Sequence, residues 1–349
     1  MPPPAEDHVL ELRTHDTVPD GGLREQWERL AEQDPHATVF HGPRYLARYA
    51  EVLGAPGEVR IHTLHREGQL VGVVPEAHER VGTPTGPGEV RRFLGGSEVT
   101  DYLGPIGRPE DRAEIAATYL ADLAADRDWD EALLGGLAAD SGWSAVLTTA
   151  AEQAGLTVLE QQVEDVCPVV DLAGGYDAYL GRLPGKLRQE LTRKTRKLAR
   201  DAGALELVEV PADEVAGELD AFLDLAAESA PDKAGFFRRS EMHDWFRTLA
   251  EEFAPDHVLR LHRLEVGGLL AAATVSLVWR GRWGLYNSAF DPVLAALSPG
   301  IVLVGLLLEQ AAGEGCDVLD LLRGDEPYKY RFGAQDRPVE RFTLQRGGA

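Results

Sequence analysis

The chain has 349 residues, of which 44% are hydrophobic, and a formal net charge of −23. This length favours two domains over a single core, and the hydrophobic content excludes a chain that is disordered throughout. A chain this acidic repels nucleic acid as a whole, which argues against DNA binding. Its longest apolar run, Ile301–Leu308, is far shorter than the roughly 20 residues that span a bilayer. The N-terminal segment MPPPAEDHVL lacks a signal-peptide pattern, so we expect a cytoplasmic protein without a membrane span.

The acidic and basic residues are unevenly distributed. Residues 1–165 carry 30 acids and 13 bases, giving −17, whereas residues 166–349 carry 28 acids and 22 bases, giving −6. One segment, Arg182–Arg200, holds eight bases and a single acid. If the protein binds a polyanion, we expect this segment to make the contact; a solvated helix face is the alternative.

No residue pattern points to a metal. The two cysteines, Cys167 and Cys316, are too far apart in the sequence for a metal or redox motif, and both lie in stretches typical of strands. We predict that they are reduced thiols in the core. His62 and His65 lie three positions apart on a predicted strand and therefore point to opposite faces. No metal site is expected.

The first half shows the periods of helices and strands in turn. Helices are predicted where apolar residues recur every three or four positions, at 23–32, 43–52 and 109–125. Strands are predicted at 9–13, 58–65, 70–78, 91–94, 131–134 and 157–162. Two of these strands form a hairpin around Arg66–Gly68, and the segment Thr83–Gly88 is predicted to be a loop because it is rich in proline and glycine.

The second half repeats these patterns. Its predicted helices are at 176–183, 186–202, 212–228, 241–253 and 299–312. Its predicted strands are at 166–171, 205–210, 257–265, 269–279, 282–290, 318–322 and 339–344. Both halves therefore follow the order helices, antiparallel hairpin, strand, helix, strand. Two copies of one α+β unit explain this order most simply, so we expect domains at residues 1–165 and 166–349.

The most informative segment is Trp283–Gly333, which predicts a strand, a helix and a second strand placed side by side. Ser298 is a favourable N-cap, Pro299 suits the first helical turn, and Gly300 allows a ligand to approach the free backbone N–H groups. Such a helix end attracts phosphate. These three residues are the predicted anchor for a phosphate-bearing donor; an ordinary capped core helix is the alternative.

Three segments together carry a family resemblance: Thr100–Pro105, the arginine-rich helix with Arg188, Arg193 and Arg196, and the run that includes Leu297–Gly300, Asp320, Gly324 and Lys329. In this order and spacing the chain resembles the CelD/BcsL-type acyltransferases, a branch of the N-acetyltransferase (GNAT) superfamily. Its second half is similar to the FemAB peptidyltransferases. The resemblance covers about residues 30–335. It implies tandem GNAT-like (acyl-CoA N-acyltransferase) domains, each a mixed, mainly antiparallel sheet flanked by helices, with the donor site in the second.

The resemblance also implies a role for Lys329. FemAB-like enzymes carry a lysine in a Phe/Tyr-Lys pair near the last strands, and Tyr328-Lys329 matches that pair. We expect the lysine to stabilise charge that develops during acyl transfer; a surface loop with local ion pairs is the alternative. Ordinary acyl-CoA acetyltransferases have an Arg/Gln-x-x-Gly-x-Gly/Ala pyrophosphate loop, which has no counterpart at 297–301. The identity of the donor therefore stays open.

Acyl transfer to an amine also needs a group that takes the proton of the nucleophile. The candidate bases are the carboxylates near the predicted donor site: Asp325, Glu326 and Asp291. Further candidates for donor binding are polar residues on the central strand and the basic helix, namely Tyr286, Ser288, Arg193 and Arg196. In strict alternation Tyr286 and Ser288 share one face of their strand.

We therefore expect an acyltransferase that moves an acyl group from acetyl-CoA or another acyl-CoA directly to an amine or hydroxyl, without a metal. The acceptor would be a small molecule or a cell-envelope or polysaccharide precursor. One alternative is a FemAB-like peptidyltransferase that uses aminoacyl-tRNA, for which one basic helix is a small contact surface. Another is a GNAT-like protein that binds a ligand without catalysis.

Overall fold

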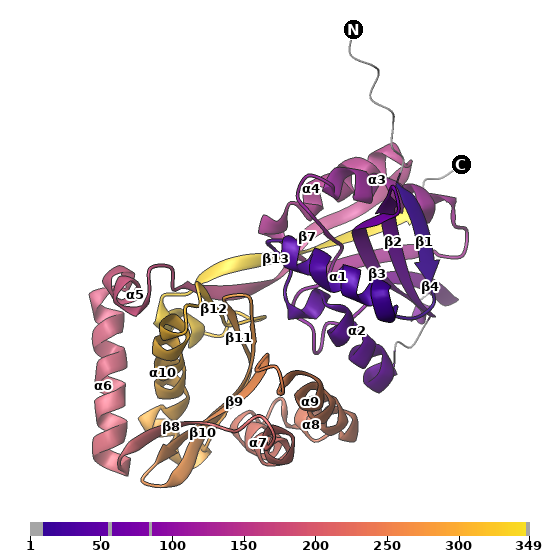
Figure 1. Cartoon of the computed structure of the whole chain (residues 1–349). Helices are drawn as coiled ribbons and strands as arrows, with labels where there is room; N and C mark the ends of the chain where they lie inside the picture. Colours follow the sequence, from indigo (N-terminus) through magenta and orange to yellow (C-terminus); the bar gives the residue numbers. More distant parts are fainter. Residues whose placement is uncertain (1–9, 55–57, 84–85, 347–349) are drawn as a thin grey trace. The chain divides into compact units, whose positions relative to one another are not determined.

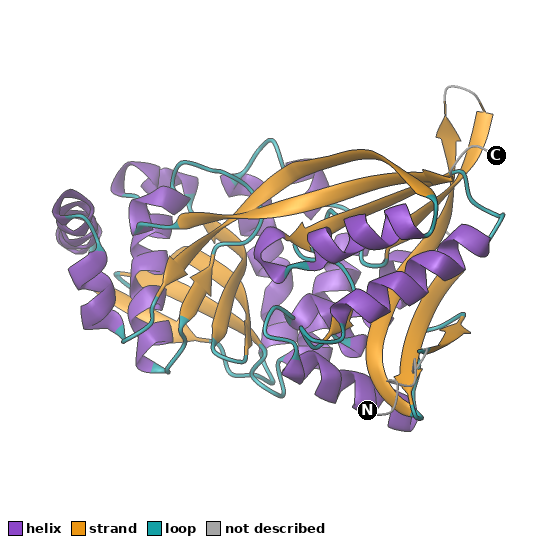
Figure 2. Cartoon of the chain, turned by 90° about the horizontal axis from the view of Figure 1, so that it is seen from above, coloured by secondary structure: helices purple, strands orange, loops and turns teal. Residues whose placement is uncertain are grey.

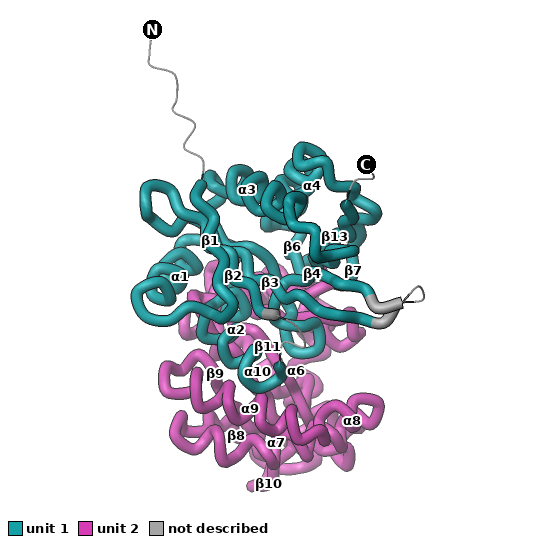
Figure 3. Tube along the Cα trace, turned by 90° about the vertical axis from the view of Figure 1, so that its right-hand side faces the viewer, with its two compact units in different colours: residues 1–165, 337–349 teal, residues 166–336 magenta. Residues whose placement is uncertain are grey.

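The computed structural model describes residues 10–54, 58–83 and 86–346. Two compact units divide the chain, one of residues 1–165 and 337–349 and the other of residues 166–336 (Figure 3). The boundary lies inside strand β7 (Leu156–Asp171), and the chain returns to the first unit through β13 (Gln335–Arg346). We expected the second domain to run to residue 349. The last residues group with the first unit because β13 pairs antiparallel with β6 (Glu131–Ala138).

The first unit is built on a mixed sheet in the order β1-β2-β3-β4-β6-β13-β7, with β5 paired to β3. β4 pairs with β6 in parallel, whereas β1–β2, β2–β3, β3–β4 and β6–β13 are antiparallel. The remaining strands are β1 (Glu11–His15), β2 (Glu58–Arg66), β3 (Gln69–Thr83), β4 (Gly86–Phe93) and β5 (Ile106–Gly107). The helices are α1 (Gly21–Gln33), α2 (Pro43–Tyr49), α3 (Arg112–Ala125) and α4 (Trp143–Gln153).

The second unit has the strand order β7-β12-β11-β10-β9-β8. β11 and β12 pair in parallel, and the other neighbouring pairs are antiparallel. Its strands are β8 (Leu205–Glu209), β9 (Leu259–Val266), β10 (Leu269–Trp279), β11 (Arg282–Phe290) and β12 (Val318–Asp320). Its helices are α5 (Tyr176–Arg182), α6 (Gly185–Ala202), α7 (Val215–Ser229), α8 (Ala234–Phe237), α9 (Ser240–Phe253) and α10 (Pro299–Gly313).

Helices cover both faces of the second unit's sheet. α5, α6 and α10 lie on one face, and α7, α8 and α9 lie on the other (Figure 1). α10 is apolar on nearly all sides because it is enclosed between the sheet and α6; its buried side chains include Val302, Leu303, Val304, Leu307 and Leu308. The separation of strands and helices into layers is also visible in Figure 2. The predicted α+β class, with mixed sheets flanked by helices, is confirmed.

The two units share a hairpin with the same sequence pattern. Arg60–Leu64 reads RIHTL on β2, and Arg260–Leu264 reads RLHRL on β9. In each unit the arginine forms an ion pair with the acidic residue that C-caps the helix between the parallel strands. Arg60 pairs with Asp126 at 3.7 Å, after α3, and Arg260 pairs with Glu314 at 2.6 Å, after α10. The repeat therefore extends from sequence to tertiary contacts, which supports a duplicated unit.

Several predicted elements need correction. The segment Thr83–Gly88 is not a simple loop: β3 runs through Thr83 and β4 begins at Gly86, while residues 84–85 lie outside the described residues. The predicted strands at 157–162 and 166–171 are one continuous strand, β7. The first strand is Glu11–His15, and Val9 lies outside the described residues. We did not predict helix α4. Its N-cap is Gly142, which has a positive φ of 77° and no side chain that could form a capping hydrogen bond, so the sequence lacks the usual signal for a helix start.

Within the described ranges, no helix is both long enough and apolar enough to cross a bilayer. The same residues contain no group of three or more His, Cys, Asp or Glu side chains placed to hold a metal ion. Cys167 and Cys316 are buried, as predicted, and neither forms a disulfide.

Candidate functional site

The candidate site lies where two parallel strands of the second unit part. β11 pairs with β12 over only three residues of each strand, from Arg282–Val318 to Gly284–Asp320. Beyond that point β11 continues to pair with β10 as far as Phe290. The chain after Asp320 instead bonds to β7, with Leu321 N–H donating to Pro168 O at 2.9 Å. The two strands therefore diverge, and an extended ligand can lie along the edge of β11 that β12 does not cover.

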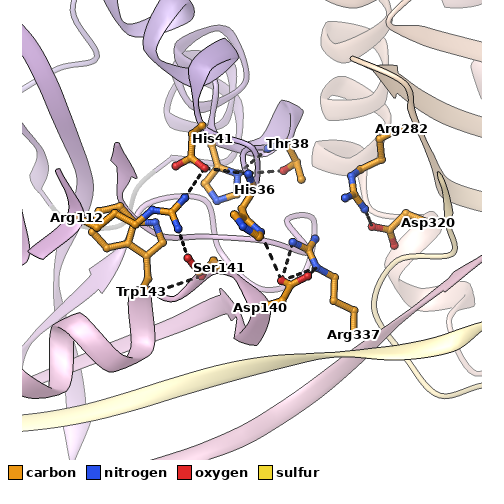
Figure 4. Close-up of polar contacts among 11 residues, drawn as sticks. His36, Thr38, His41, Arg112, Asp140, Ser141, Trp143, Arg282, Asp320 and Arg337 are labelled. Carbon is orange, nitrogen blue, oxygen red and sulfur yellow. Dashed lines mark hydrogen bonds and ion pairs between the residues drawn. The ribbon is translucent and has the colours of Figure 1, made fainter. Parts of the chain in front are cut away.

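An ion pair closes the paired end of this opening. Arg282 Nη1 lies 3.0 Å from Oδ2 of Asp320, a fully buried carboxylate (Figure 4). The other oxygen, Oδ1, accepts the N–H of Leu322 at 2.9 Å. That bond holds Leu322 at a φ of 56°, a left-handed conformation unusual for leucine. Asp320 therefore fixes the turn by which the chain leaves the sheet and enters the loop 322–329.

A β-bulge lies in β11 at this opening. Val275 faces Asn287 and Ser276 faces Leu285, so Tyr286 is an additional residue on β11. Its hydroxyl accepts Trp245 Nε1–H from α9 at 3.1 Å. The bulge breaks the regular alternation that we assumed for Tyr286 and Ser288. Tyr286 packs against α9 on one side of the sheet, whereas Ser288 is exposed and bonds to Tyr328.

Tyr328 is a titratable group beside the opening in β11. Its hydroxyl bonds to the side chain of Ser288, so it links the loop after β12 back to β11. Burial raises the pKa of Tyr328 to about 12, with a smaller contribution from Glu326. The hydroxyl is therefore neutral at physiological pH and keeps a proton to donate. The sequence predicted Tyr328 only through its place beside the lysine.

Lys329 is buried, with 2% of its surface exposed. Its Nζ donates to the carbonyl oxygens of Leu322, Arg323 and Gly324 at 2.8, 2.7 and 2.9 Å. It also lies 2.9 Å from Glu326 Oε2. A lysine ammonium has three N–H donors, and the protein already offers four acceptors. This geometry favours a lysine that shapes the loop 322–329 over one that binds a substrate oxyanion.

The three predicted bases have different surroundings. Glu326 is half-buried between Lys329 and Lys233, whose Nζ is 3.5 Å away. Burial raises the pKa of Glu326, but the hydrogen bond and charge of Lys329 together with the charge of Lys233 and a backbone hydrogen bond outweigh burial and leave the pKa below its ordinary value. Asp325 is exposed on the same loop. Asp291 accepts Val293 N–H at 2.8 Å and so caps the short 3-10 helix Pro292–Leu297.

Two lysines of α6 approach the start of α10. Lys194 Nζ donates to Ser298 Oγ at 2.8 Å, and Lys197 Nζ donates to Ala296 O at 3.1 Å. Burial lowers the pKa of Lys194, as do nearby cations including Arg331. Ser298 occupies the N-cap position as predicted, but its φ is 57° and its side chain makes no capping bond. We missed both lysines because their partners are about a hundred residues away in the sequence.

The other predicted donor-binding residues lie at or near this helix start. Pro299 is buried at the first turn of α10. A glycine is not sterically required at position 300, because an added Cβ would lie 3.6 Å from Phe290, an ordinary van der Waals contact. Arg193 and Arg196 point to solvent on the outer face of α6, whereas Lys194 reaches the start of α10. Lys197 lies at the edge of the outer face, where its Nζ bonds to Ala296 O.

The first unit contains a separate polar cluster (Figure 4). Arg337 Nη2 lies 2.9 Å from Asp140 Oδ1, and His36 Nδ1 lies 3.7 Å from the same oxygen. Burial alone would raise the pKa of Asp140, but His36 and Arg337 lower it to about 2. Nearby, His41 Nδ1 accepts Thr38 N–H at 3.1 Å, and burial lowers the pKa of His41 to about 4. We did not single out this cluster in the sequence because its members are spread from residue 36 to residue 337.

The substitution His41→Asn is expected to make the free energy of unfolding depend less steeply on pH in the acidic range. The unfolded chain binds a proton at the ordinary histidine pKa of 6.5, whereas native His41 binds one only near pH 4. Native stability is therefore lost as pH falls from about 6.5 to about 4, by up to ~1.4 kcal/mol per pH unit from this group. Asparagine keeps an acceptor for Thr38 N–H but does not titrate. Urea unfolding at several pH values measures the slope, and exposed His257→Asn should keep the wild-type slope. An unchanged slope in His41→Asn would show that His41 does not titrate in this window.

Comparisons with known proteins relate the second unit to a family of known domains. Residues 185–330 match a family described as an acetyltransferase (GNAT) domain, and this segment contains the whole β11–α10–β12 crossover. A search of curated proteins finds no match. Among solved structures, FemX superposes with a TM-score of 0.66 at 9% identity, covering 95% of this chain and 96% of FemX. A protein of unknown function from Bacteroides thetaiotaomicron has a TM-score of 0.61 at 10% identity, covering 96% of this chain and 100% of its own. At such low identity these likenesses show the fold alone.

Proposed function

We propose that the second unit transfers an acyl group from an acyl thioester such as acyl-CoA to an amine or hydroxyl. The acceptor class that we favour is a small molecule or a cell-envelope or polysaccharide precursor, in the manner of the CelD/BcsL-type acyltransferases. The divergence of β11 and β12 after three paired residues is the observation that carries this proposal. It leaves an edge of β11 on which the amide groups of a pantetheine arm can bond like an added strand.

The residues around this opening have separate roles in the proposed reaction. The phosphate end of the donor lies at the start of α10, near Lys194 and Lys197. The acceptor nitrogen or oxygen attacks the thioester carbonyl carbon, and the carbon–sulfur bond breaks. The neutral hydroxyl of Tyr328 donates its proton to the leaving sulfur, and the proton lost by the acceptor restores it. Lys329 and Glu326 hold the loop that positions Tyr328.

A second candidate is aminoacyl transfer from tRNA, as in FemAB-like peptidyltransferases. The exposed basic face of α6 is the observation that favours it. The same opening between β11 and β12 would then receive the aminoacyl ester. A third candidate is a GNAT-like protein that binds its ligand without catalysis. It would bind an anion at the start of α10 but show no turnover.

Acetyl-CoA or a longer acyl-CoA is expected to raise the midpoint of thermal unfolding. A ligand that binds only the native state stabilises it by about 2.7 kcal/mol at a hundredfold excess over Kd. Lys194→Met should reduce this shift because it removes a cation beside Ser298. Lys186→Met, an exposed lysine in the first turn of α6, is the matched control and should retain the shift. No shift with any acyl-CoA would remove CoA thioesters from the candidate donors.

A further inference from the structure

We infer that the outer face of α6 docks an acidic carrier protein, which presents the acyl thioester on a phosphopantetheine arm. This inference rests on the proposed acyl transfer and names the form in which the donor arrives. The outer face is defined by the side chains that line a shallow groove of about 760 Å³: Arg188, Gln189, Thr192, Arg193, Arg196, Lys197 and Arg200.

The composition of this face fits an acidic protein partner. Its seven lining residues include five cations and no acid. Arg188, Arg193 and Arg196 are exposed, so their charges are available to a partner. Arg200 is also exposed, and its Nε lies 2.7 Å from Asp201 Oδ1. The face belongs to one helix of 18 residues, which is about 27 Å long. Opposite charge on two such surfaces orients the partners and speeds their encounter.

The rest of the chain makes the charge of α6 distinctive. Residues 182–200 carry eight bases and one acid, a net charge of +7, so the other residues together carry −30. A tRNA presents a long phosphate tract, which would extend past α6 and be repelled by the acidic residues of the rest of the chain. A small acidic protein can place its charges against α6 alone. The distribution of charge therefore favours a compact acidic partner over an extended nucleic acid.

An apolar side chain adjoins the basic face. Val293 is 87% exposed and lies in the short 3-10 helix Pro292–Leu297. Lys197 Nζ ties this segment to α6 through Ala296 O. Protein interfaces combine an apolar contact with surrounding arginines in this way. A bilayer surface would instead call for a row of bulky apolar residues along the helix.

The start of α10 fits a donor with few phosphates. Residues 297–301 contain one glycine and no arginine, and the cations that reach this point are Lys194 and Lys197. A carrier-bound arm has a single phosphodiester, whereas free CoA has a pyrophosphate and a 3′-phosphate. In the carrier-dependent reaction the acceptor attacks the thioester carbonyl carbon. The carbon–sulfur bond then breaks, and the phosphopantetheine thiol leaves with a proton while the acceptor loses one.

Fluorescence anisotropy with a labelled, acetyl-loaded acyl carrier protein of fatty-acid synthesis tests this inference. We expect binding at 50 mM NaCl and a Kd that rises at least about tenfold at 300 mM NaCl, since exposed charges are screened by salt. The triple variant Arg193→Glu, Arg196→Glu, Arg200→Glu should raise the Kd at 50 mM NaCl by a similar factor. The matched control reverses three exposed arginines outside α6, Arg29→Glu, Arg80→Glu and Arg238→Glu, and should bind as the wild type does. Equal Kd values for both variants would overturn the inference.

Competition and turnover separate the remaining outcomes. If tRNA or anionic phospholipid vesicles bind through α6 and the carrier protein does not, the inference is wrong. If acyl-CoA is turned over and the carrier is not bound, the inference fails while the proposed acyl transfer stands. If the carrier binds through α6 but neither thioester is consumed, the docking surface stands and the proposed transfer fails. With both correct, the triple variant should lose at least about tenfold in kcat/KM for the loaded carrier relative to acyl-CoA.

Discussion

Replacing Lys329 by methionine is expected to lower the free energy of unfolding by about 4 kcal/mol, the range found when one partner of a buried ion pair is removed. Methionine fills nearly the same volume, so little of the loss comes from packing. The substitution leaves the carbonyls of residues 322–324 without their shared donor and removes the cation that lies 2.9 Å from Glu326. Urea unfolding monitored by tryptophan fluorescence measures the change.

Lys233→Met is the matched control for this prediction. Lys233 also faces Glu326, at 3.5 Å, but its side chain is exposed. Pairs of this kind contribute about 0–1 kcal/mol, so the control should be nearly as stable as the wild type. If Lys329→Met were as stable as the control while turnover was lost, the lysine would act on the substrate as the sequence predicted. A large loss of stability supports its role in shaping the loop.

Sequence periodicity was sufficient for most of the second unit. The basic helix was predicted at 186–202 and observed at Gly185–Ala202, and the crossover helix was predicted at 299–312 and observed at Pro299–Gly313. These predictions succeeded because each helix shows its pattern within its own residues. α6 has an apolar side and a charged side, and α10 contains the apolar run Ile301–Leu308 shortly after a proline.

The long strands could not be predicted in the same way. β7 includes residues 163–165, which contain the acidic Glu164 and Asp165 and which we took as the gap between two strands. Its continuity depends on strands from elsewhere in the chain, β13 and β12, which lie on either side of it. The strand at 339–344 was likewise observed over Gln335–Arg346. Pairing across such distances overrides local composition.

The details of the site depend on contacts that the sequence does not reveal. Lys329 donates to three carbonyl groups because of the path of the loop 322–329. That path is set by the left-handed Leu322 and by Gly324, where an added Cβ would meet Glu326 Oε2 at 2.7 Å. The bulge at Tyr286 has no local sequence marker either. The sequence thus predicted the segments around the candidate site more reliably than the contacts that each side chain makes there.

The duplicated plan also gives a reason to place the proposed donor site in the second unit and not in the first. In the first unit, Arg66 Nη1 holds Asp111 Oδ1 at 2.7 Å at the start of α3, and the Asp111 carboxylate is buried. Glu114 in the same first turn also pairs with Arg66. The chain's own carboxylates thus occupy the helix end that would attract a phosphate. Ser298 is the N-cap of α10, and the first turn of α10 contains no acidic residue. The N-terminal end of this helix can therefore accept an external anion.

Replacing Tyr328 by phenylalanine is expected to reduce kcat by about 10²–10⁴-fold, the usual contribution of a positioned general acid. The change removes one hydroxyl, which bonds to Ser288 and whose pKa burial raises to about 12. The aromatic ring keeps its packing against the core, so the free energy of unfolding should fall by only about 1 kcal/mol. Steady-state kinetics with acyl thioester and amine acceptor measure the effect.

Tyr330→Phe provides the matched control for the hydroxyl. Its phenol bonds to Asp336 Oδ1 at 2.7 Å, and that bond raises its pKa to about 12 as well. The two tyrosines therefore share chemistry and pKa but differ in place, because only Tyr328 bonds to β11. If both variants lost activity equally, the effect would come from the loop and not from proton donation. A loss confined to Tyr328→Phe, with KM unchanged, would assign the leaving-group proton to Tyr328, since an interaction made only in the transition state appears in kcat.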